Sequence, residues 1–187
     1  MPSKIDKIKE PIKYLRTTNR KKGKMYITFL KGLMIRKTRG MDSLAAALNK
    51  EAFKKIDCLK CANCCKTMSP TYTKVDVQRI SKHVGMTYKE YFDKYLYLDE
   101  TGDIMNKKTP CQFLRKDNKC SIYHVRPKDC SGFPHTQLKD FKLFITGTHK
   151  QNIEYCPITL NIVEKMHEII IDQGKRNLSA KDAKIHS

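Results

Sequence analysis

Eight cysteines constrain this chain of 187 residues more than any other feature, because they follow a tight and regular spacing. The densest group reads Cys58-x-x-Cys61-x-x-Cys64-Cys65. A Cys-x-x-Cys turn presents two sulfurs on one side of a tight loop, where both can bind the same metal ion. The part of the chain that carries this group is therefore expected to fold around bound metal.

The spacing of the cysteines favours two sets of thiolate ligands. The first set, which ends in a distant Cys-Pro pair like that of a bacterial ferredoxin motif, comprises Cys58, Cys61, Cys64 and Cys156. A second set of four is arithmetically possible and comprises Cys65, Cys111, Cys120 and Cys130. Neighbouring cysteines in an extended segment point to opposite sides, so Cys64 and Cys65 suit different sites. His124 and His135 lie near these cysteines in sequence and can replace one ligand.

The spacing leaves the identity of the metal open, because four thiolates suit both a tetrahedral zinc ion and an iron–sulfur cluster. Two interpretations without metal also remain, namely four disulfides or small buried thiols. The chain begins without the apolar segment of a secretory signal, and no run approaches the ~20 apolar residues of a membrane-spanning helix. We therefore expect a cytoplasmic protein without a membrane span, in which disulfides are rare.

The chain is strongly basic, with 38 Lys and Arg against 19 Asp and Glu and a net charge of +19. Residues 1–57 concentrate this excess, since they hold 16 basic and 5 acidic residues. Basic surfaces bind phosphates through counterion release, so RNA or DNA is a candidate partner. A solvated basic face is the alternative interpretation of the same charge.

Charge and cysteine distribution together predict three segments. These are a basic helical N-terminal extension over 1–57, a cysteine-cluster metal-binding domain over 58–174 and a polar tail over 175–187. The expected fold class is α-rich α+β: a small helical domain with irregular cysteine-bearing loops and short strands organised around metal.

Hydrophobic periodicity and capping residues predict the individual elements. In the extension, Ile5, Ile8, Ile12 and Leu15 have helical spacing, but Pro11 should break that helix. Residues 20–24 are expected to form an exposed loop, and residues 43–56 a helix capped by Asp42 or Ser43.

The cysteine region carries two further helix signals. Capping boxes begin at Thr73-x-x-Asp76 and Thr87-x-x-Glu90, and the second is followed by an aromatic stripe that should face a core. Short strands are expected within 102–123 and at 141–148. The last helix should start at Pro157 and end at Gly174.

The motifs of the cysteine region resemble the YkgJ-like cysteine-cluster proteins, a family known for a CxxCxxCC zinc- or iron-chelating domain. The resemblance covers about residues 55–160. It is carried by the first cysteine group, Thr73-x-x-Asp76, Pro110-Cys111-Gln112-Phe113-Leu114, the segment from Cys120 to Cys130, Phe133-Pro134 and Cys156-Pro157.

The resemblance implies metal binding by the cysteines but little about a reaction. Flagellin lysine methylases look similar in this region, so a cluster-dependent transferase or redox enzyme acting on a protein substrate is an alternative. The chain departs from residues common among such relatives at three positions, Lys66, Ser131 and Ile158. These differences leave the cysteine ligands unchanged but weaken the case for a shared substrate site. Arg126, beside the cysteines, is expected to offset the negative charge of bound thiolates. No set of catalytic residues stands out, so the sequence does not require an enzyme.

Overall fold

The computed structural model describes residues 7–36 and 39–185, with side chains described up to residue 174. Ile5 of the expected first helix therefore lies outside the described residues. The chain forms two compact units. The first unit combines the chain up to Ile56 with the segment from Pro134 onward, and the second unit is Asp57–Phe133. The domain boundaries expected at residues 57 and 174 stay predictions, since this grouping follows packing within the chain.

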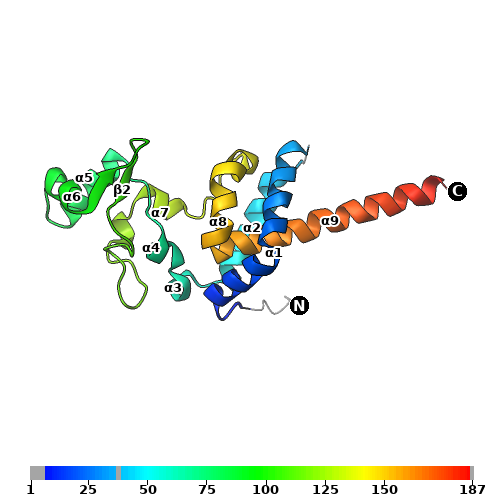
Figure 1. Ribbon diagram of the computed structural model, residues 1–187, viewed down its shortest axis with the longest axis horizontal. Helices are drawn as coiled ribbons and strands as arrows, with labels where there is room; N and C mark the ends of the chain where they lie inside the picture. Colours follow the sequence, from blue (N-terminus) through cyan, green and yellow to red (C-terminus); the bar gives the residue numbers. More distant parts are fainter. Residues whose placement is uncertain (1–6, 37–38, 186–187) are drawn as a thin grey trace. The chain divides into compact units, whose positions relative to one another are not determined.

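The first unit is built from helices. In chain order they are α1 (Pro11–Ile35), α2 (Met41–Lys55), the short turns η2 (Phe141–Phe144) and η3 (Ile145–His149), α8 (Lys150–Tyr155) and α9 (Pro157–Ile185). Both α1 and α2 pack against α9, so the N-terminal helices share a core with the C-terminal one. Figure 1 shows α1 in blue crossing the orange start of α9.

Helix α1 corrects two expectations for the N-terminal region. Pro11 is the first residue of the helix instead of its breaker, because a proline in the first turn loses no helical hydrogen bond. Residues 20–24, expected as a loop, continue the same helix. Leu15, Tyr26 and Leu30 are buried along it, so packing of this apolar face sustains the helix through its basic stretch.

A carboxylate on α9 holds α1 in place. Glu164 accepts hydrogen bonds from the hydroxyls of Tyr14, at 2.7 Å, and Tyr26, at 2.9 Å. Lys22 lies 3.5 Å from the same carboxylate, whose side chain is only 15% exposed. Burial opposes the ionisation of Glu164, but the two hydroxyls and Lys22 keep its pKa below the usual range. The carboxylate thus ties three side chains of α1 to α9.

Two further expectations for the first unit need correction. Gly40 precedes α2 with φ +74°, and Asp42, expected to cap the helix, instead accepts the backbone N–H groups of Asp140 and Phe141, each at 2.9 Å. Residues 141–148 form helical turns instead of a strand, because burial recurs every four residues, at Phe141, Ile145 and His149.

The last helix begins at Pro157 as predicted but does not end at Gly174. It runs on to Ile185, and Figure 1 shows this continuation as one straight helix in orange and red. A single glycine inside a helix costs about 1 kcal/mol, which is too little to end a long helix.

The second unit combines short helices with a small sheet. Its elements are α3 (Cys58–Cys61), α4 (Asn63–Thr67), α5 (Lys74–His83), α6 (Tyr88–Tyr95), β1 (Leu96–Leu98), β2 (Ile104–Asn106), η1 (Tyr123–Val125) and α7 (Lys128–Gly132). The two strands are antiparallel, and Leu96 faces Asn106. Within 102–123, the structure has the strand β2, a bridge from Ile104 to Tyr72 and a bridge between Leu114 and Cys120.

Both capping boxes of the second unit are confirmed. The hydroxyl of Thr73 accepts the N–H of Asp76, and that of Thr87 accepts the N–H of Glu90. Of the aromatic stripe on α6, Tyr91 is fully buried and stacks against Phe113, with ring centroids 6.3 Å apart. The stripe therefore faces a core, as predicted from its helical spacing.

The helix-rich architecture with a two-stranded sheet agrees with the expected α-rich α+β class. None of the described helices is both long enough and apolar enough to cross a bilayer.

Replacing Glu164 by alanine should destabilise the first unit. The change leaves two partly buried tyrosine hydroxyls without their acceptor, which should lower the free energy of unfolding by about 2–3 kcal/mol. Chemical denaturation followed by circular dichroism measures this loss. Glu168→Ala is the matched control on the same helix, since its ion pair with Lys165 is exposed and should contribute less than about 1 kcal/mol. Equal losses in the two variants would contradict the anchoring role.

Candidate metal centre

The CxxCxxCC segment folds into two consecutive helical turns. Asp57 caps the first turn, α3, by accepting the N–H of Leu59 at 2.9 Å. Ala62 then adopts a left-handed conformation with φ +46°, and the second turn, α4, begins directly after it. Cys58 and Cys61 thus lie on α3, while Cys64 and Cys65 lie on α4.

The expectation that Cys64 and Cys65 point to opposite sides is wrong. Their sulfurs are 4.0 Å apart, because α4 is helical and successive side chains diverge by about 100° instead of 180°. A tetrahedral zinc site with Zn–S bonds of ~2.3 Å separates its sulfurs by ~3.8 Å. The observed separation therefore permits the two neighbouring thiols to share a site as well as to serve different ones.

Backbone hydrogen bonds help to place Cys111 and Cys130. The N–H of Cys111 donates to the carbonyl of Cys65 at 2.8 Å. Cys130 lies on α7, whose first N–H, that of Lys128, donates to the Asp76 carboxylate at 3.2 Å. The same carboxylate accepts the backbone N–H of Thr73 in the capping box of α5, so one buried carboxylate joins this helix to the start of the cysteine-bearing turn.

Four thiols of the second unit form one electrostatic group, which we call the four-thiol set: Cys65, Cys111, Cys120 and Cys130. Every pair within the set is close enough for a thiolate at one position to raise the pKa of another. These are the same four cysteines as in the second ligand set that the sequence permits. The fold thus gathers four sulfurs that are separated by up to 65 residues.

The members of the set differ in acidity. Burial raises the pKa of the Cys111, Cys120 and Cys130 thiols, since a charged sulfur is poorly solvated there. Cys65 is the exception, because a hydrogen bond from Cys64 and the charge of Lys66 lower its pKa to about 7, although burial opposes them. The set therefore combines one thiol that ionises near neutral pH with three that resist ionisation without a cation.

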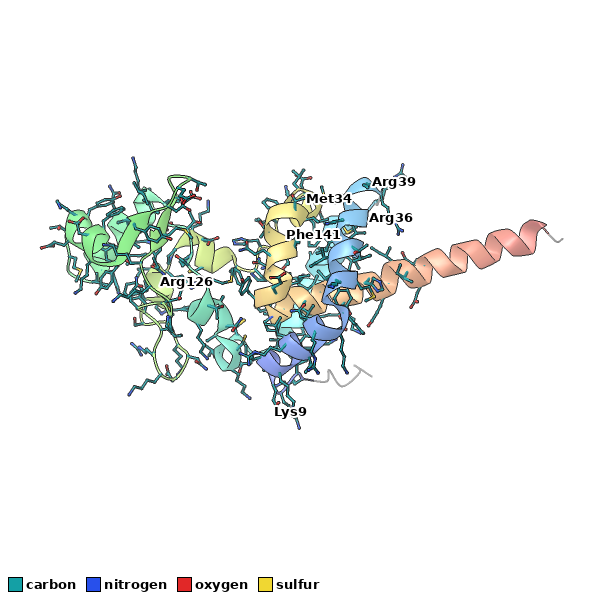
Figure 2. The ribbon with its side chains drawn as sticks, viewed as in Figure 1. Lys9, Met34, Arg36, Arg39, Arg126 and Phe141 are labelled. Carbon is teal, nitrogen blue, oxygen red and sulfur yellow. The ribbon has the colours of Figure 1, made fainter. Side chains whose placement is uncertain are left out.

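Basic side chains lie beside the set. Both Arg126 and Arg115 favour the thiolate form of Cys120 and oppose the rise in its pKa that burial causes. Arg126, labelled in Figure 2, lies over the ring of Tyr123, with 3.8 Å from the guanidinium carbon to the ring centroid. The role expected for Arg126 beside metal-bound thiolates stays a prediction. The sequence motifs did not predict a role for Arg115. Its position before a turn that leads back to Cys120 could have indicated that it lies near this cysteine.

The remaining candidate ligands are distributed over both units. Cys58 is exposed and Cys61 is buried in the second unit, whereas Cys156 is buried in the first. The first expected ligand set, which includes these three residues, stays a prediction. The His124 ring packs edge-on against Tyr123, and His135 belongs to the first unit with φ +64°.

The donor set of the second unit suits zinc or iron chemically, but the thiols do not yet form a closed cage. Within the described residues, no three side chains of His, Cys, Asp or Glu are arranged to hold a metal ion. Closing the four-thiol set on an ion would therefore require its side chains to turn toward one another. Four thiolates with nearby cations match the ligand chemistry of both metals.

Cys65 should be the most reactive thiol of the set in metal-free protein. Its pKa of about 7 predicts that alkylation by iodoacetamide rises through neutral pH, whereas Cys130 stays protonated and slow. Peptide mapping by mass spectrometry after timed alkylation measures both rates. Lys66→Gln should move the Cys65 profile to higher pH, because the variant lacks the cation that favours the thiolate. A pH profile of Cys65 identical to that of Cys130 would contradict this ranking.

Comparison with known proteins extends these observations to a family. An uncharacterized protein of Methanocaldococcus jannaschii is 34% identical over 96 residues, which cover 48% of this chain and 50% of that protein. The chain therefore aligns with only half the length of this relative. No solved structure matches the chain.

A family profile matches residues 57–157, from the residue that caps α3 to the proline that begins α9. Its description reads "putative zinc- or iron-chelating domain". The matched residues include the CxxCxxCC segment, all of the four-thiol set and Cys156. The chain belongs to the CxxCxxCC family, as its cysteine motifs predicted.

Proposed function

We propose that this protein binds zinc or an iron–sulfur cluster through its cysteines, with Cys65, Cys111, Cys120 and Cys130 as one four-thiolate site. The mutual proximity of these four thiols is the observation that carries the proposal. The family description as a zinc- or iron-chelating domain supports it.

The physical argument starts from the burial of the four sulfurs. Four thiolates close together in a partly buried site repel one another, and a divalent cation removes that repulsion. The surrounding basic side chains, Lys66, Arg115 and Arg126, offset part of the remaining charge of a metal–tetrathiolate group. Ligation would also join α4, α7 and the intervening loops of the second unit, so metal binding would stabilise the fold of that unit.

We assign Cys58, Cys61 and Cys64 of the second unit to a second site. The regular spacing of these three thiols suits a cluster or a zinc ion. The 4.0 Å between the Cys64 and Cys65 sulfurs would place two such sites next to each other. A cytoplasmic location fits this proposal, because thiols persist in a reducing compartment. A cluster-dependent reaction on a protein substrate would need an open coordination position at one of the sites, and it stays a prediction.

Metal and sulfide analysis of anaerobically purified protein tests the assignment to two sites. Cys130→Ser should remove one ion or cluster per chain and leave the other, and Cys58→Ser should remove the other one instead. Ser131→Ala is the matched control and should keep full metal content. It removes a hydroxyl next to Cys130 that donates to the backbone carbonyl of Lys128. A visible spectrum with acid-labile sulfide identifies iron–sulfur, and colourless protein with bound zinc identifies zinc.

Two results would overturn the proposal. Purified wild-type protein without stoichiometric zinc or iron would contradict metal binding itself. Equal metal loss in the Cys58→Ser and Cys130→Ser variants would contradict the partition into two sites while leaving metal binding intact.

A second candidate function rests on the exposed face of α1. This helix contains no acidic residue, and its buried residues lie along the opposite face. Five exposed basic side chains fall within ~80° of arc and extend over ~27 Å: Lys13, Arg16, Arg20, Lys24 and Lys31. Arg36 and Arg39, labelled in Figure 2, add two exposed cations beyond its C-terminal end. We propose that this basic face binds the phosphate backbone of a nucleic-acid duplex, through charge and without sequence preference.

Duplex binding at low salt tests this second proposal. Replacing Arg16, Arg20 and Lys24 together by glutamine should reduce affinity and lower the slope of log K against log salt by about 2–3, since each phosphate contact contributes about 0.9. A triple glutamine variant at Lys74, Lys82 and Lys89 is the matched control, because it removes the same charge from exposed sites in the second unit. Fluorescence anisotropy measures both. Equal effects of the two triples, or no duplex binding by wild-type protein, would exclude a specific role for α1.

A further inference from the structure

A buried asparagine, Asn106, lies beside the four-thiol set. Asn106 ends β2 and is 4% exposed. Its backbone N–H donates to the hydroxyl of Ser69 at 2.7 Å. A polar side chain is costly to bury unless each of its hydrogen-bonding groups finds a partner, so the surroundings of the amide show what holds it there.

The amide oxygen of Asn106 is fully used. It accepts the hydroxyl of the buried Tyr72 at 2.7 Å and the Nε2 of Gln112 at 3.2 Å. Because a carbonyl oxygen has two lone pairs, these donors satisfy it and fix the orientation of the amide plane. The Nδ2 group is therefore held in a defined direction instead of turning freely.

The amide nitrogen of Asn106, unlike the oxygen, has no hydrogen-bond partner. Asn106 Nδ2 is buried and meets no acceptor at full hydrogen-bonding geometry. Leaving such a donor without a partner costs about 1–3 kcal/mol. The side chain is nevertheless within reach of the Cys111 sulfur. Burial raises the pKa of the Cys111 thiol, and the nearby amide of Asn106 opposes that rise.

Metal binding would make the Cys111 sulfur a stronger hydrogen-bond acceptor. A neutral thiol accepts hydrogen bonds weakly, whereas a metal-bound thiolate carries negative charge and accepts them more strongly. A donor that is fixed in advance beside a ligating sulfur stabilises the ligated form and withdraws charge from the sulfur. The buried Nδ2 would gain its missing partner in the same step.

We infer that Asn106 is a positioning residue of the metal site, and that its Nδ2 donates to the Cys111 thiolate while Tyr72 and Gln112 hold its oxygen. This inference rests on the proposed function, because it requires Cys111 to bind metal. It extends that function by naming a donor outside the cysteine motif that tunes the metal–sulfur bond.

Cobalt(II) is the probe for this contact, because it takes up tetrahedral thiolate sites and its sulfur-to-metal charge-transfer band reports the charge on the sulfur. Metal-free full-length protein is titrated with Co²⁺ under anaerobic conditions. Asn106→Leu should weaken Co²⁺ binding by about 10- to 100-fold. It should also move the charge-transfer band to lower energy, since the thiolate retains more charge without its donor.

Two further variants separate positioning from general stability. Tyr72→Phe removes only the hydroxyl that fixes the Asn106 oxygen, so it should shift the band in the same direction by less, and it tests the inference even where Asn106→Leu fails to fold. Asn49→Leu is the matched control in the first unit, where a buried asparagine accepts the Thr136 hydroxyl at 2.7 Å. This variant should lose stability and leave the band unchanged.

The outcomes are distinguishable from those of the proposed function. Wild-type protein without a thiolate-to-cobalt band would overturn the proposed function together with this inference. A wild-type band that Asn106→Leu and Tyr72→Phe leave unchanged in energy, with unchanged Co²⁺ affinity, would overturn the inference alone. A band shift in Asn49→Leu equal to that in Asn106→Leu would also overturn it, since a general loss of stability would then explain both.

Discussion

Mutual repulsion among closely placed thiolates is the constraint on which the cysteine-bearing unit depends. Burial raises the pKa of three members of the four-thiol set, and each thiolate that forms opposes the next. Without a cation, burial and mutual repulsion keep these three thiols protonated. In the proposed site, a bound cation would turn the same sulfurs into strong ligands that join segments far apart in sequence. Nearby basic and amide groups favour the thiolate forms of Cys65, Cys111 and Cys120.

The two units reach stability by different routes. The first unit buries long apolar helix faces and fastens α1 to α9 through one carboxylate and its hydroxyl donors. The second unit has short elements, a two-stranded sheet and a small core around Tyr91 and Ile80. Small cores of this kind commonly gain part of their stability from metal. Seven of the eight cysteines lie in this second unit, which has the smaller core.

The parts of the site that could be predicted from sequence were those encoded locally. The Cys-x-x-Cys spacing, the two capping boxes and the helix start at Pro157 each depend on residues within one or two turns. Predictions failed where tertiary packing overrode local preference. Pro11 and the basic run after it suggested a broken helix, but burial of Tyr26 and Leu30 against α9 sustains α1. Segment 141–148 reads as a strand, yet burial at four-residue intervals makes it helical.

The cysteine motif alone identified the family and the class of ligand, because thiolate chemistry and spacing are properties of the chain itself. It left open which cysteines belong together and which other side chains act on them. The sequence offered the four-thiol set only as an arithmetical possibility. The proximity of its members depends on how α4, α7 and the loops between them are placed around one another, since electrostatic coupling depends on distance in space. Asn106 had no signal in the sequence, because its role comes from Tyr72 and Gln112, which contact it only in the folded unit.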